Sequence, residues 1–89
     1  MSWKAALLRI NKMSEESKRL YFDLIKTTYQ GWFDAGDRQY PDKFIDMVRT
    51  HTTELVRLVE ANSMTKTSAY EESYRFGLMQ HSAFYSKDL

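Results

Sequence analysis

The sequence predicts an all-α protein organised as an antiparallel helical hairpin, at about residues 15–35 and 41–62, with a short N-terminal helix before it and a C-terminal helix or arm after it. Apolar residues recur at three- and four-residue steps along most of the chain, which is the spacing of one helix face. The sequence holds three glycines and one proline, and that proline lies between the two longest periodic stretches. Because 89 residues suffice for one small domain, we expect residues 1–89 to fold as a single unit.

The first element is predicted at residues 1–13 as a short amphipathic helix. At helical spacing, most apolar residues of this stretch fall on one side and the basic residues fall on the other. The apolar side consists of Trp3, Ala6, Leu7, Ile10 and Met13, and the basic side consists of Lys4, Arg9 and Lys12. The pattern therefore predicts a helix with a basic outer face.

The second element opens the helical hairpin, which we place at residues 14–62. Ser14 is predicted to cap the helix at about 15–35, because its hydroxyl can accept a hydrogen bond from a free N–H of the next turn. The apolar side covers more than half of the circumference, which is more than one neighbouring helix can cover. Its members are Leu20, Tyr21, Phe22, Leu24, Ile25, Thr28, Tyr29, Trp32 and Phe33. Gly31 lies at its edge and predicts either close approach of another backbone or a looser helix.

The third element is predicted at about residues 41–62, after a short polar loop. Gly36 is interpreted as a left-handed helix terminator, and Pro41 as a first-turn residue of the next helix. An apolar pattern then continues for about five helical turns and ends before Asn62. The short connection between two helices of similar length predicts an antiparallel pair.

The last segment, residues 63–89, is rich in aromatic residues and is predicted as a helix at about 68–85. Ser68 and Glu71 have the spacing of a capping box, in which each side chain bonds a free N–H of the first turn. An apolar stripe then follows at three- and four-residue steps, formed by Tyr70, Tyr74, Leu78, His81 and Tyr85. Gly77 falls within this stripe and weakens the helical pattern, so an irregular docking arm is the alternative.

The charge of the chain is balanced, with 13 Lys and Arg residues against 12 Asp and Glu residues. Nucleic-acid-binding proteins usually concentrate basic residues on one face, so this balance argues against a nucleic-acid partner. The longest apolar run, residues 5–8, is too short for an integral membrane segment, and no secretory leader is recognisable. Cysteine is absent, which excludes disulfides and thiolate chemistry. We expect a cytoplasmic protein.

The two histidines are the first candidates for acid–base or metal chemistry. Neither His51 nor His81 has a glutamate three residues before it, as a Glu-x-x-His metal motif requires, and we interpret both as packed side chains. The serines and threonines have no histidine or lysine partner at a recognisable spacing. We therefore expect no enzymatic activity, no catalytic residue, no metal and no other cofactor.

Aromatic residues, 15% of the chain, gather toward the two ends and around the hairpin loop. Tyrosine, tryptophan, methionine and arginine are enriched at the centres of protein interfaces. The sequence therefore predicts a protein–protein interaction module, an accessory or regulatory subunit or an inhibitor of a larger protein. A second chain, either another copy or a hetero-partner, is expected to complete the helical bundle. The predicted partner-binding residues are Trp32, Tyr70, Tyr74, Arg75, Leu78, Met79, Phe84 and Tyr85.

Two alternative functions use the N-terminal segment. In the first, the basic amphipathic stretch binds a membrane surface or a hydrophobic particle as a peripheral protein. In the second, the chain is a dimeric nucleic-acid-binding regulator whose cations contact phosphates. The residues assigned to lipid or phosphate contact are Trp3, Lys4, Arg9 and Lys12.

Overall fold

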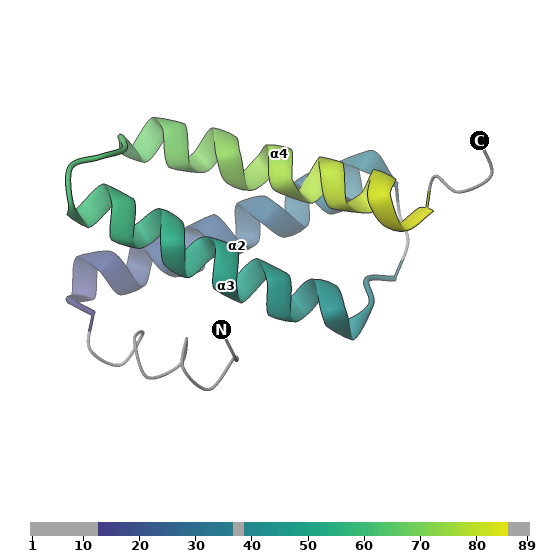
Figure 1. Cartoon of the computed structure of the whole chain (residues 1–89), viewed down its shortest axis with the longest axis horizontal. Helices are drawn as coiled ribbons and strands as arrows, with labels where there is room; N and C mark the ends of the chain where they lie inside the picture. Colours follow the sequence, from purple (N-terminus) through teal and green to yellow (C-terminus); the bar gives the residue numbers. More distant parts are fainter. Residues whose placement is uncertain (1–12, 37–38, 86–89) are drawn as a thin grey trace.

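The computed structural model describes residues 13–36 and 39–85, and these ranges are all-helical, with no strand (Figure 1). The three helices are α2 (Glu15–Ala35), α3 (Asp42–Glu60) and α4 (Lys66–Tyr85). Helix α3 returns antiparallel to α2, and α4 then runs in the same direction as α2 (Figure 1). The predicted all-α class is confirmed, and the C-terminal segment is a helix as far as Tyr85. The helix predicted at residues 1–13 lies, except for Met13, outside the described residues.

Helix α2 begins as its sequence predicts. The Ser14 hydroxyl accepts a hydrogen bond from the Ser17 N–H at 3.2 Å, so that one of the free donors of the first turn has a partner. At the other end, the Gly36 N–H donates to the Trp32 carbonyl oxygen at 3.2 Å. The prediction of a left-handed terminator is wrong, because Gly36 has an extended backbone with φ 172°. A Cβ at this position would lie 2.6 Å from the His81 ring, so the ring would have to shift to accommodate a side chain.

Helix α3 begins one residue later than predicted. Pro41 lies just before the first turn, with an extended backbone of φ −76° and ψ 157°, and its carbonyl oxygen accepts from the Phe44 N–H at 2.9 Å. The helix ends at Glu60, two residues before its predicted end, and Asn62, with φ 57°, then turns the chain through the left-handed region.

Helix α4 begins two residues before its predicted start. The Thr65 hydroxyl accepts a hydrogen bond from the Ser68 N–H at 3.1 Å, so that Thr65 acts as the N-cap. The Ser68 hydroxyl is instead an acceptor for the Thr65 hydroxyl at 3.0 Å. The capping box predicted at Ser68 and Glu71 is therefore wrong, because both residues lie inside the helix.

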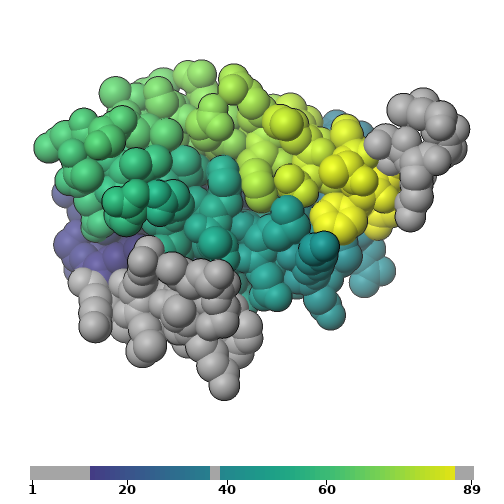
Figure 2. Space-filling model, viewed as in Figure 1, coloured from purple at the N-terminus to yellow at the C-terminus, as the bar shows by residue number. Residues whose placement is uncertain are grey.

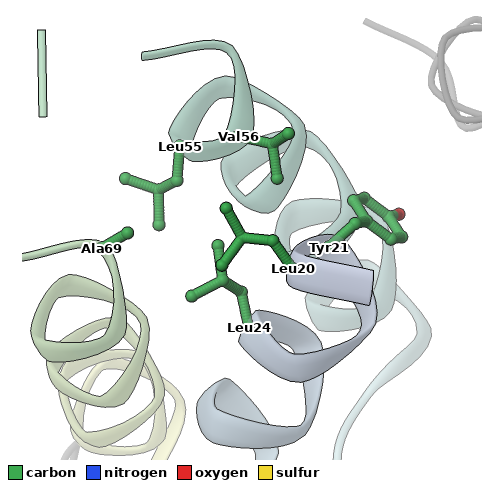
Figure 3. Close-up of a cluster of buried hydrophobic side chains, with 6 residues drawn as sticks. All are labelled: Leu20, Tyr21, Leu24, Leu55, Val56 and Ala69. Atoms are coloured by element: carbon green, nitrogen blue, oxygen red, sulfur yellow. The ribbon is translucent and has the colours of Figure 1, made fainter. Parts of the chain in front are cut away.

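The core consists of two clusters of buried side chains. The first lies near the start of α2 and gathers residues from all three helices (Figure 3). Its buried members are Leu20, Tyr21, Leu24, Leu55, Val56 and Ala69. The second cluster lies near the end of α2 and consists of Trp32, Phe44 and Val48, with half-buried aromatic side chains around it.

Small residues allow α4 to lie directly against α2. The face that α4 turns inward is a stripe at four-residue steps, Ala69, Ser73, Gly77 and His81, and all four residues are buried. Together α3 and α4 cover most of the wide apolar side of α2. Completion of the bundle by a second chain stays a prediction. The large apolar residues left exposed in the described ranges are Phe22, Phe33 and Met79.

Candidate interaction surface

A shallow hollow of about 450 Å³ lies on the surface of α4, and all the residues that line it belong to this helix. Tyr70, Tyr74 and Leu78 are four residues apart in sequence and so follow one line along the helix. Glu71 and Arg75, one residue further round the helix, complete its lining. The hollow thus combines two aromatic rings and a leucine with one acidic and one basic side chain at its rim.

The two tyrosines are fixed by aspartates of α2. The Tyr70 hydroxyl donates to Oδ2 of Asp23 at 3.2 Å, and the Tyr74 hydroxyl donates to Oδ2 of Asp34 at 2.5 Å. This bond to Tyr74, together with a bond from Gln30 Nε2 at 2.7 Å, holds the pKa of the Asp34 carboxyl below its usual value. The pKa of Tyr74 is raised in turn, mainly by its bond to the carboxylate. Both rings are therefore held against α2.

Arg75 and Met79 are the most accessible of the predicted residues on α4. Arg75 Nη1 lies 3.0 Å from Oε1 of Glu72, and its side chain is 60% exposed. Met79, one turn further along α4, is also 60% exposed, while Leu78 is half-buried. An exposed ion pair of this kind contributes little to stability, so the Arg75 guanidinium is accessible to a partner.

Trp32 belongs to the core and not to the partner surface that the sequence predicts. It is fully buried, its ring centroid lies 4.3 Å from that of Phe44, and it meets the His81 ring edge-on at 4.9 Å. Phe84 and Tyr85 also pack against Trp32, with ring centroids 6.0 and 5.9 Å away. These two residues therefore cover one end of the core, and the Tyr85 hydroxyl donates to the Gln39 carbonyl oxygen at 2.7 Å.

The structure exposes two aromatic residues that the sequence places in the apolar side of α2. Phe22 is 54% exposed and Phe33 is 44% exposed. Both lie at the edge of the apolar arc on a helical projection, beyond the reach of α3 and α4. Their position at that edge is the one signal in the sequence that could have distinguished them from Trp32.

The histidines are packed against aromatic rings, as predicted. Helices α3 and α4 adjoin on the face that Figure 2 shows. Between these helices, the His51 ring stacks on Phe76 with centroids 3.9 Å apart and planes at 10°. Burial lowers the pKa of His51, and the charge of Glu72 partly opposes this. His81 is 8% exposed, and neither its Nε2 nor the Nδ1 of His51 has a hydrogen-bond partner.

In the described part of the chain, no group of three histidine, aspartate or glutamate side chains is placed to hold a metal ion. None of the helices described is long and apolar enough to cross a bilayer. The residues assigned to lipid or phosphate contact, Trp3, Lys4, Arg9 and Lys12, lie outside the described residues. Comparison with known proteins finds no matching family model, no similar curated protein and no similar solved structure.

Proposed function

We propose that this chain is a small non-catalytic interaction module that binds another protein through helix α4. In this proposal it acts as an accessory or regulatory subunit, or as an inhibitor, of a larger protein. The observation that supports it is the hollow on α4, which gathers four of the eight residues that the sequence assigns to partner binding: Tyr70, Tyr74, Arg75 and Leu78.

The composition of this hollow suits the centre of a protein interface. Tyrosine and arginine are enriched among the residues that dominate binding free energy, because they bury a large area and keep a polar group for hydrogen bonding. Here the bonds of Tyr70 and Tyr74 to α2 already fix both rings. Binding would therefore cost less side-chain entropy than it would with freely rotating rings.

Two kinds of partner, a second copy of the chain and a different protein, would give complexes of different composition. A second copy of the chain would complete a larger helical bundle, whereas a larger protein would give a hetero-complex. Light scattering on the purified chain distinguishes them, because a homodimer doubles the mass of 10.6 kDa. Chemical capture from the native host then identifies a hetero-partner.

The decisive experiment compares two arginines in matched settings. Arg75 on α4 and Arg57 on α3 each pair with a glutamate three residues earlier, and their side chains are 60% and 54% exposed. Arg75→Glu is expected to weaken capture of the partner by about tenfold or more, as is usual for an interface arginine, while Arg57→Glu leaves capture unchanged. A photo-reactive residue at position 78 should cross-link to the same partner.

The proposal fails if Arg75→Glu and Arg57→Glu capture the partner equally well, with both variants folded by circular dichroism. It also fails if the chain is monomeric and position 78 cross-links to no protein.

A further inference from the structure

Helix α2 presents two exposed phenylalanines on its outer face. Phe22 and Phe33 are eleven residues apart, which is about three helical turns or 16.5 Å, so both rings lie on the same side of the helix. Each ring meets a tyrosine edge-on, Phe22 against Tyr21 at 5.4 Å and Phe33 against Tyr40 at 6.3 Å between centroids. Tyr29 lies half-buried between them. The face therefore carries a line of aromatic rings.

The same face is basic. Arg19 and Lys26 are exposed beside the phenylalanines, and neither has an ion pair or hydrogen bond with any residue in the described ranges. Lys18 lies 3.7 Å from Glu15, a carboxylate that is itself 93% exposed. Asp23, four residues after Arg19 and three before Lys26, lies at the edge of this face, and its carboxylate, like that of Asp34, accepts a hydrogen bond from a tyrosine of α4. Unpaired cations thus flank the aromatic line.

From this arrangement we infer that the outer face of α2 binds an acidic amphipathic helix of another protein. Helices that dock on such surfaces place apolar side chains at positions i, i+4, i+7 and i+11, and the span from i to i+11 equals the span from Phe22 to Phe33. Glutamates beside these anchors would then meet Arg19 and Lys26. This face is separate from the hollow on α4, so the inference does not depend on the function proposed for that hollow.

Charge distinguishes this occupant from a second copy of the chain. In an antiparallel pair of α2 helices that brings Phe22 to Phe33 of the other copy, Lys26 would lie within one turn of its own counterpart. Like charges that close repel each other, and the Glu15 carboxylate on the same face lies about three turns away from Lys26. An acidic helix satisfies the same aromatic spacing and removes the repulsion.

The test uses the whole chain and three fluorescein-labelled helical peptides, measured by fluorescence anisotropy at low salt. The probe has leucines at i, i+4, i+7 and i+11 with glutamates at the flanking positions. One control peptide has the same composition in scrambled order, and the other has lysines in place of the glutamates. Saturable binding is expected for the acidic patterned peptide alone, and it should weaken as salt is raised.

Substitutions on the chain then locate the site. Lys26→Glu and the double variant Phe22→Ser, Phe33→Ser should each weaken binding by about tenfold or more. Lys43→Glu, a matched reversal at an exposed lysine of α3, should leave it unchanged. Thermal unfolding checks that each variant is folded. Because Lys26→Glu removes no apolar contact, its effect on binding is separate from any effect on the core.

Four results would overturn the inference. The first is equal binding of the lysine peptide or the scrambled peptide, and the second is unchanged binding by Lys26→Glu. The third is binding to vesicles with anionic lipids that is lost in the phenylalanine variant, which would assign the face to a lipid surface. The fourth is dimerisation in light scattering that the same variant abolishes, which would assign it to a second copy.

Discussion

Gly31 of α2 and Gly77 of α4 lie where the two helices touch backbone to backbone. A Cβ on Gly31 would lie 2.2 Å from the carbonyl oxygen of Tyr74, and a Cβ on Gly77 would lie 2.0 Å from that of Thr28. Neither contact involves a flexible side chain that could move away. This crossing sets the distance between α2 and α4, and so determines whether the α4 tyrosines reach the α2 aspartates.

Gly77→Ala is expected to destabilise the fold by about 1–3 kcal/mol, the range typical of overpacking in a core. In an exposed helix the same change would stabilise by up to about 1 kcal/mol, because alanine has the higher helix propensity. A loss of stability in Gly77→Ala would therefore show that α2 and α4 are in close contact at this residue, whereas a gain would show that they are not. Urea unfolding followed by circular dichroism measures it.

Ser82→Ala on the exposed side of α4 is the control for helix propensity. It should leave stability unchanged or raise it slightly. If Gly77→Ala proved as stable as the wild type, the close approach of α2 and α4 would be wrong.

Tyr74→Phe is expected to raise the pKa of Asp34 toward its ordinary value of 3.8, because the hydroxyl bond is the main cause of the lowered pKa. A carboxyl whose pKa is lowered by folding stabilises the fold above its unfolded value, and this contribution is lost as the pH falls through the folded pKa. The wild type should therefore be more stable than Tyr74→Phe at neutral pH, with the difference narrowing below about pH 3.8.

Carboxyl chemical shifts recorded against pH report the Asp34 titration directly. The analogous variant Tyr70→Phe should leave the Asp34 pKa where it is, since Tyr70 bonds to Asp23 instead. An Asp34 pKa that did not move in Tyr74→Phe would show that the two residues are not bonded in solution.

His51 is expected to make the fold less stable in mild acid. Its pKa in the folded chain lies below the ordinary value of 6.5, chiefly because of burial, so the unfolded chain binds the proton more readily. The stabilising contribution is complete above pH 6.5 and is lost as the pH falls from 6.5 through the folded pKa.

Replacement of Glu72 tests the electrostatic part of this account. The charge of Glu72 raises the pKa of His51, so Glu72→Gln should lower that pKa further and move the His51 titration to lower pH. Proton NMR of the imidazole signals measures the His51 pKa in the wild type and in Glu72→Gln. His51→Gln should remove the part of the pH dependence of stability that comes from His51. A His51 pKa at or above 6.5 in the wild type would contradict the stacked, buried position against Phe76.

Much of the local structure could be predicted from the sequence because it depends on nearby residues. The predicted helix at 15–35 has the observed bounds, both ends of the next helix differ by one or two residues, and the last helix starts two residues earlier than predicted. The parallel packing of α4 on α2 depends on Gly31 and Gly77, which are 46 residues apart, and no local pattern connects them. Gly77, which weakens the helical pattern of α4, is the residue that allows this packing.

The site was harder to predict because a helical projection does not show which part of the apolar side of α2 is covered by α3 and α4. Tyr70, Tyr74 and Leu78 line one hollow because they follow one line on a single helix, with Arg75 one residue further round. Trp32 and Phe33 are adjacent and equally apolar, but only the first faces α3 and α4. The direction in which each points is set by packing over long sequence distances.

These two neighbours provide the last prediction. Trp32 is fully buried against Phe44 and His81, so Trp32→Ala should cost about 3–5 kcal/mol of stability, as for other large residues removed from a core. Phe33 is 44% exposed, and Phe33→Ala should cost about 1 kcal/mol or less, as is usual away from a core. Chemical denaturation of both variants gives the comparison. Phe33→Ala should in addition weaken binding of the acidic peptide while the chain remains folded. If the two substitutions proved equally destabilising, Phe33 would be a core residue and the outer face of α2 would lose one of its two anchors.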